Sequence, residues 1–298
     1  MSFPTVIDSS ILAEYKACAY KFKLGAVDEY KPKGQSVHLH AGGAFARGME
    51  AARNAFWVQN LSAESAVAAG LGALLTAYGD FECPSDSAKS AERMAGAFEF
   101  YFSRYPLGGD GTEPIKFASG RRGIEFSAAQ PLPLIHPDSG DPILYSGRMD
   151  AINSYAGGIF ITDEKTTTQL GASWARQWDL RSQFTGYSWL CRENGIKVDG
   201  VLVRGISILK TKYDTAEAIS YRPEWQVERW YKETLIWINR MVEDYKAGHF
   251  LRNLDHSCAE YGGCMFKTCC ASLDEAPWLE TYFERRHWDP IAGKETVL

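Results

Sequence analysis

Two short acidic motifs contain residue types that are suited to chemistry on a phosphate ester. Residues 147–150 (GRMD) end in Asp150, and residues 163–166 (DEKT) begin with Asp163, thirteen residues later. Two carboxylates that meet repel one another, and a divalent cation between them removes the repulsion. A nearby lysine supplies positive charge where an attacking water and a phosphate build up negative charge. Glu125, on the predicted strand before the first motif, is a further candidate metal ligand.

Strand alternation determines how these side chains are arranged. Asp163 and Lys165 are two residues apart and share one face of a strand, whereas Glu164 points to the opposite face. If the two strands pair as a hairpin around residues 154–158, Asp150 approaches Asp163. An isolated Asp-x-Lys tripeptide is usually a pair of solvated strand charges. The apolar strand before it and the second strand aspartate favour the catalytic interpretation here.

A third motif lies on the next predicted helix, where Gln183 and Tyr187 are one turn apart on the same face. In this order the three motifs resemble the catalytic core of RecB-like nucleases of the PD-(D/E)XK superfamily. The resemblance implies that Asp150 and Asp163 bind Mg²⁺ or Mn²⁺ and that Lys165 positions the nucleophile. It also implies that Gln183 and Tyr187 line the DNA-binding side of the site.

The sequence departs from this family on an N-terminal helix. Many relatives have the pattern Gly-x-x-x-His-x-x-x-Glu, and residues 42–50 match it except that Ala46 takes the place of the histidine. His38 and His40 lie just upstream and are candidate replacements, although a lone histidine is more often structural or exposed. Glu50 stays a candidate acidic ligand. The resemblance covers roughly residues 120–270 of the chain.

Four of the seven cysteines lie within thirteen residues near the C-terminus, in the segment SCAEYGGCMFKTCC. An odd number of cysteines in a chain with no visible signal peptide speaks against a disulfide framework. Clustered thiolates outside a disulfide context usually bind metal. The spacing, with five residues between successive cysteines at 258, 264 and 270, matches neither a zinc finger nor a ferredoxin.

The cysteines resemble the iron–sulfur module of AddB and of CRISPR-associated RecB-like nucleases, in which one cysteine precedes the nuclease core and three follow it. The resemblance implies a [4Fe–4S] cluster that joins both ends of the chain. Its four expected ligands are Cys18, Cys258, Cys264 and Cys270. Cys269, adjacent to Cys270, is the alternative last ligand, and Cys83 and Cys191 are expected to be ordinary thiols.

The elements that must position these residues indicate one α/β domain over residues 1–298. The first hundred residues are mostly helical, and short strands then alternate with helices. The predicted helices are 9–24, 41–59, 62–78, 86–104, 174–193 and 223–247, and the predicted strands are 122–128, 143–153, 158–165, 200–209 and 217–222. The expected fold is restriction-endonuclease-like, with a mixed central sheet flanked by helices. Its expected parts are a helical elaboration (1–110), the nuclease core (111–250) and a cysteine-rich segment with the tail (251–298).

The composition limits the class of protein. The 298 residues are 45% hydrophobic, which is enough for a large core, and the net charge is −5. A DNA-binding protein with this charge must bind through a local groove with its own cations, because a broad basic surface would make the chain positive. No apolar run approaches the roughly 20 residues of a membrane span, and no secretory signal is visible. The expected location is the cytoplasm, of the host cell if the gene is phage-borne.

The leading hypothesis is a metal-dependent DNA nuclease, an exonuclease acting on DNA ends or single strands in recombination, repair or phage replication. A second hypothesis is a non-catalytic nucleic-acid-binding or assembly protein that keeps the fold and the cluster, which the absence of the family histidine favours. A third is a structural protein stabilised by zinc, with an accidental Asp-x-Lys. The retained acidic pair and lysine favour the first hypothesis.

Overall fold

The computed structural model describes residues 2–34, 36–259, 263–292 and 296–297. The chain divides into two compact units, each assembled from separate stretches. The unit that we call the cysteine unit contains Met1–Gly34, Ser127–Gly147 and Glu228–Leu298, and the unit that we call the acidic unit contains Gln35–Phe126 and Arg148–Val227. The division into a helical part, a core and a tail within one nuclease domain stays a prediction. No helix among the described residues is long and apolar enough to span a membrane.

The strands form one mixed sheet of eight strands and a separate two-stranded ribbon, as the expected fold requires. The order is β10-β4-β5-β6-β7-β8, with β1 and β3 also pairing with β5, and β2 pairs with β9. The strands are β1 (Val6–Ile7), β2 (Tyr30–Pro32), β3 (Glu113–Pro114), β4 (Ile124–Ile135), β5 (Pro142–Tyr155), β6 (Gly158–Thr167), β7 (Gly200–Ile208), β8 (Tyr213–Tyr221), β9 (Phe283–Arg285) and β10 (Thr296–Val297). The β6–β7 pair is parallel, whereas β5–β6 and β7–β8 are antiparallel. Helices flank the sheet, which confirms the predicted fold class.

The helices follow the predicted apolar periodicity with two corrections. They are α1 (Ser9–Ala17), α2 (Ala19–Phe22), a π-helix (Lys23–Val27), α3 (Val37–Trp57), α4 (Ala63–Tyr78), α5 (Ala91–Arg104), α6 (Ala172–Arg176), α7 (Ser182–Glu193), α8 (Glu224–Ala247), α9 (His256–Ala259), α10 (Lys267–Cys270) and α11 (Ala276–Tyr282). The predicted helix 9–24 breaks at Cys18, whose backbone is extended, and the carboxylate of Asp8 caps its N-terminus. The predicted helix 174–193 divides into α6 and α7 because Arg181 is extended.

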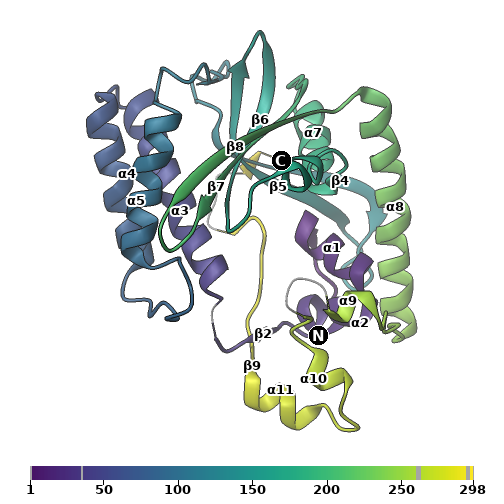
Figure 1. Cartoon of the computed structure of the whole chain (residues 1–298). Helices are drawn as coiled ribbons and strands as arrows, with labels where there is room; N and C mark the ends of the chain where they lie inside the picture. The colour runs from purple at the N-terminus through teal and green to yellow at the C-terminus, as the bar shows by residue number, and fades with distance from the viewer. Residues whose placement is uncertain (1, 35, 260–262, 293–295, 298) are drawn as a thin grey trace. The chain divides into compact units, whose positions relative to one another are not determined.

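Three helices of the acidic unit pack together, and this packing fixes the position of α3. Helices α3, α4 and α5 lie side by side (Figure 1). Gly48 and Gly70 permit the close approach of α3 and α4, since a Cβ on Gly70 would lie 2.7 Å from the Cβ of Ala52. Phe45 and Phe98 meet edge to face in this core, with ring centroids 5.6 Å apart. A small residue is therefore required at both glycine positions.

The cysteine unit joins early and late stretches of the chain. The Tyr15 hydroxyl donates a 2.7 Å hydrogen bond to Asp244 of α8. The side-chain amide of Asn253 donates to the carbonyl oxygen of Ala17 at 2.8 Å. Phe22 is buried and meets Tyr15 edge to face. The segment around Cys18 is therefore fixed by residues of α8 and of the stretch that follows α8.

Candidate functional site

The β5–β6 hairpin brings the two motif aspartates together. Its register runs from Tyr155 opposite Gly158 to Ala151 opposite Thr162, so Asp150 and Asp163 are the next residues beyond the last pair, on one face. Ala156 and Gly157 at the turn both have positive φ. The Glu164 backbone N–H donates to Asp150 Oδ2 at 3.1 Å. The predicted hairpin and the predicted approach of the two aspartates are confirmed.

Burial dominates the electrostatics of the pair. Desolvation raises the pKa of Asp150 well above its ordinary value, and the charges of Asp163 and Glu164 raise it further. The Lys165 Nζ lies 2.6 Å from Asp163 Oδ1, as the alternation predicts. Desolvation also raises the pKa of Asp163, although the lysine opposes this. Burial alone would lower the pKa of Lys165, but the two aspartates raise it, so the ammonium stays charged.

The donor set at this hairpin fits a hard divalent cation. Asp150 and Asp163 are oxygen ligands of the type that Mg²⁺ and Mn²⁺ prefer; Asp163 is buried, Asp150 is partly buried, and each lies near a like charge. Within the described ranges, no group of three or more His, Cys, Asp or Glu side chains is arranged to hold a metal ion. Two carboxylates suit Mg²⁺ in particular, because it usually keeps several waters and takes further oxygens from substrate phosphates.

Glu125 and Glu50 lie close enough to interact with each other. Glu125 has a φ of 47°, which is rare for a residue other than glycine, and its Oε2 lies 3.1 Å from Arg148 Nε. Burial raises the pKa of Glu125 to about 7; Arg148 opposes the increase and Glu50 adds to it. The charge of Glu125 also acts on Asp150. Both candidate ligands therefore extend the acidic region around the aspartate pair.

Glu164, the middle residue of the second motif, points away from the aspartate pair, as the alternation predicts. It is buried and forms an ion pair with Arg53 of α3, and its Oε1 accepts a hydrogen bond from the Tyr101 hydroxyl at 3.1 Å. The sequence reasoning missed Arg53 and Tyr101. The available signal was a charged residue one turn beyond Glu50 on an otherwise apolar stretch of helix.

Helix α7 covers the lysine with its first turn. Lys165 Nζ lies 6.0 Å from the centre of the Phe184 ring. The Gln183 Nε2 donates to the Tyr187 hydroxyl at 2.9 Å, so the two residues share one face, as predicted. The role of this pair in DNA binding stays a prediction. His40 packs on the Phe81 ring at 4.0 Å and bonds the Tyr78 carbonyl oxygen at 2.8 Å, which gives it a packing role.

Three of the expected cluster cysteines interact in the cysteine unit. Burial raises the pKa of Cys270; Arg252 opposes this, and the charges of Cys18 and Cys264 add to it. Cys18 Sγ accepts a 3.4 Å hydrogen bond from a backbone N–H after α8. The Cys264 N–H bonds the Cys258 carbonyl oxygen at 3.1 Å. Cys18 lies far from Cys264 and Cys270 in the sequence, so the two ends of the chain contribute to this group.

The remaining cysteines differ in burial. Cys269 is 1% exposed, whereas Cys270 is only partly buried. Cys191 is completely buried in the acidic unit, and desolvation raises its pKa to about 12. Its Sγ lies 3.5 Å from the Met149 sulfur. Cys83 is partly exposed and also belongs to the acidic unit. Cys83 and Cys191 are therefore separate from the clustered cysteines in the sequence and belong to the other unit.

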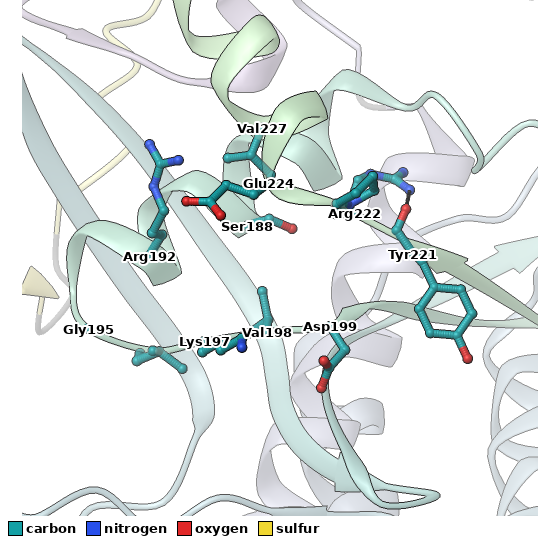
Figure 2. A pocket seen from close by; sticks show the side chains of 12 residues that line it. Ser188, Arg192, Gly195, Lys197, Val198, Asp199, Tyr221, Arg222, Glu224 and Val227 are labelled. Atoms are coloured by element: carbon teal, nitrogen blue, oxygen red, sulfur yellow. Dashed lines mark hydrogen bonds between the residues drawn. The ribbon is translucent and has the colours of Figure 1, made fainter.

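A cavity of about 790 Å³ lies at the C-terminal end of α7, and none of the predicted site residues lines it. Figure 2 shows Arg192 and Glu224 on one side of it and Lys197 and Asp199 on the other. Asp199 already accepts from the Ile159 N–H at 2.9 Å. The cavity is thus lined by charges of both signs and is separate from the aspartate pair.

Comparisons with known proteins place the chain in a family. The model of the PD-(D/E)XK nuclease superfamily matches residues 9–271. The sequence matches no curated protein. The crystal structure of a candidate exonuclease from Eubacterium rectale is similar, with a TM-score of 0.50 and 13% identity over 85% of this chain and 87% of that chain. The structure of SSO0001 is 14% identical over 65% of this chain and 73% of that chain, with a TM-score of 0.28.

Proposed function

Since the chain belongs to the PD-(D/E)XK nuclease superfamily, we propose that it is a metal-dependent deoxyribonuclease that acts as an exonuclease on DNA ends or single strands. The observation that carries the proposal is the hairpin geometry. It brings Asp150 towards Asp163 on one face, with Lys165 held 2.6 Å from Asp163. Two carboxylates that repel one another beside a charged lysine are an arrangement that a divalent cation would stabilise.

Each residue has a distinct role in this proposal. Asp150 and Asp163 hold Mg²⁺ or Mn²⁺, which when bound lowers the pKa of a coordinated water and stabilises charge on the leaving oxygen. Lys165 stays charged between the two carboxylates and donates to the attacking water or to a phosphate oxygen. Glu125 and Glu50 are candidate further ligands through water. Gln183 and Tyr187 contact the DNA strand from the first turns of α7.

The test of this function is a cleavage assay on end-labelled linear DNA and on circular DNA, with and without Mn²⁺. We expect cleavage of linear DNA that requires the metal, release of short products from the ends and no nicking of the circle. Nicked circular DNA would show that the protein is an endonuclease and not an exonuclease. No cleavage of any substrate, together with retained DNA binding, would favour a non-catalytic binding protein. Ala46 at the histidine position of the family is the observation that keeps that alternative open.

We further propose that Cys18, Cys258, Cys264 and Cys270 hold a [4Fe–4S] cluster with a structural role. The charges of Cys18 and Cys264 act on Cys270, and Arg252 offsets negative charge there, although the described cysteines are not yet arranged to hold a metal ion. The break between α1 and α2 at Cys18 turns its thiol towards a backbone N–H donor, as a thiolate ligand requires. Anaerobically purified protein should be brown and contain iron and sulfide. A colourless protein that contains stoichiometric zinc would show that the cysteines bind zinc and not an iron–sulfur cluster.

A further inference from the structure

Helix α3 is attached to strand β6 at two points on the face opposite the aspartate pair. The Arg53 guanidinium forms an ion pair with Glu164, and the side chains are 8% and 3% exposed. Further along the strand, a Cβ on Gly42 would lie 3.7 Å from Thr166 Oγ1, so the helix backbone approaches the strand closely there. Both strand residues flank Lys165 in the sequence. The position of α3 is therefore coupled to the strand that carries the second motif.

The charge of Arg53 reaches the acidic residues of the site as well as its own partner. Glu164 and Asp150 both keep the Arg53 guanidinium charged in spite of its burial. The same charge favours the ionised forms of Asp163 and Glu125. Together with Lys165, Arg53 is thus a cation that offsets repulsion among the carboxylates. Unlike Lys165, it is supplied by a helix that lies far away in the sequence.

The same helix carries Glu50, whose Oε2 forms an ion pair with Arg47 Nη1 at 2.9 Å. Glu50 and Arg53 are three residues apart on α3 and so share one face of the helix. With Arg53 held by Glu164, the charge of Glu50 reaches Glu125, and the charge of Glu125 reaches Asp150. A shift of α3 along β6 would move Glu50 away from Glu125.

We propose that Arg53 is a positioning residue of the metal site: by pairing with Glu164 it fixes α3, the helix that carries the candidate ligand Glu50, on β6, the strand that carries Asp163 and Lys165. This inference rests on the proposed function. Residues that hold metal ligands in place through a second layer of contacts typically change metal affinity by about 10–100-fold when they are removed.

The test compares two double variants of the full chain, purified with its cysteine site intact and titrated calorimetrically with Mn²⁺ alone. Arg53→Met/Glu164→Gln removes both charges of the pair, so the net charge beside Asp163 is unchanged and any change in affinity reports geometry. Tyr101 can still donate to the glutamine oxygen. We expect the Mn²⁺ dissociation constant to rise at least about tenfold.

The matched control is Arg204→Met/Asp110→Asn. Arg204 and Asp110 form a similarly buried ion pair in the acidic unit, with side chains 3% and 8% exposed. Arg204 lies opposite Glu164 in the β6–β7 register, but its ion pairs are with Asp110 and Glu217 and not with an acidic motif residue. This variant should lose thermal stability as the first variant does and keep its affinity for Mn²⁺. An unchanged affinity in Arg53→Met/Glu164→Gln, or an equal loss in both variants, would overturn the proposal.

Two further variants separate this inference from the proposed function. If Asp163→Asn still binds Mn²⁺ as the wild type does, the metal site itself is wrong, and the role of Arg53 fails with it. If Asp163→Asn loses Mn²⁺ and only the pair variant is unaffected, the role of Arg53 alone fails. Should the pair variant not fold, Arg53→Lys should stay within about threefold of wild type and Arg53→Gln should lose about tenfold. Equal affinities of these two would contradict the positioning role.

Discussion

The acidic motifs and the clustered cysteines are held in place by different means. In the acidic unit, hydrogen-bonded strand register places Asp150 near Asp163, and buried ion pairs fix the neighbouring side chains. In the cysteine unit, Cys258 and Cys270 lie on helices of four residues each, and both thiols are only partly buried. Such short helices are not stable alone. We infer that the acidic site is formed before its metal binds, whereas the cysteine segment depends on what its thiols bind.

The largest expected effect tests the preformed site. Asp163→Ala and Lys165→Ala should each slow DNA cleavage by about 10²-fold or more, because each removes a charge that acts on the reacting phosphate or its metal. Circular dichroism should show that both variants keep the fold, since the strand register does not depend on either side chain. Turnover like that of the wild type in either variant would remove this hairpin from the mechanism.

The next largest expected effect tests whether the cysteine segment depends on the group that its thiols bind. Cys18→Ser should lose the brown colour and bound iron and should lower the melting temperature by several degrees, because the thiols no longer hold the two ends of the cysteine unit together. Cys83→Ser is the matched control, since Cys83 is partly exposed and belongs to the other unit. Full iron and sulfide in Cys18→Ser would restrict the site to the C-terminal segment.

Variants of the adjacent cysteines Cys269 and Cys270 test which of the two is the last cluster ligand. Cys270→Ser should lose iron and Cys269→Ser should keep it. The charge of Cys264 acts on both thiols, but Cys270 also interacts with Cys18 and Arg252 and is only partly buried, whereas Cys269 is 1% exposed. The reverse result would shift the assignment by one residue.

A smaller effect concerns the pH dependence of the metal-free protein. In the folded state the pKa of Glu125 is about 7, above its ordinary value of 4.5, mainly because of burial. The folded state therefore binds more protons than the unfolded state between these values, and stability falls as the pH rises from about 4.5 to 7. With EDTA present, the free energy of unfolding at pH 8 should be lower than at pH 5 by on the order of 1–3 kcal/mol. Glu125→Gln should reduce this dependence without abolishing it, because the raised pKa values of Asp150 and Asp163 act in the same direction. An unchanged slope would contradict the prediction.

The smallest effect separates DNA contacts from metal ligands. Tyr187→Phe removes the hydroxyl that accepts from Gln183 at 2.9 Å and leaves the ring in place. Loss of one hydrogen bond is worth about 1 kcal/mol, so DNA binding should weaken about fivefold. The Mn²⁺ affinity, measured by calorimetry, should not change. A simultaneous loss of metal affinity would place this pair in the metal site.

The parts of the site that follow from local periodicity could be predicted from the sequence. Asp163 and Lys165 share a face because alternation is a property of the strand itself, and the hairpin follows from a short turn. Arg53 and Glu164 are separated by 111 residues, so no local pattern links them. Their pairing depends on the packing of α3 over the sheet, which amphipathic periodicity does not specify.

The fold follows the same division. Long helices and strands were predicted to within a few residues, with two exceptions. Strand β4 continues to Ile135, seven residues beyond its predicted end, and β8 begins at Tyr213, four residues earlier than predicted. The two-residue strands β1 and β10 have no periodicity to detect, because only their pairing with β5 and β4 makes them strands. The break at Cys18 was missed for a similar reason. At that break Cys18 accepts a hydrogen bond from the backbone N–H of Asn253, which is 235 residues away and so cannot be predicted from the local sequence.

The assembly of the cysteine unit from early and late stretches has a consequence for biosynthesis. Tyr15 and its partner Asp244 are separated by 229 residues, so at about 5–20 residues per second the ribosome reaches the partner some 10–50 s later. During that interval Phe3 and Phe22, both buried in the finished protein, have no complete core to enter. The nascent N-terminal segment is thus a natural client for chaperones while the acidic unit is already being made.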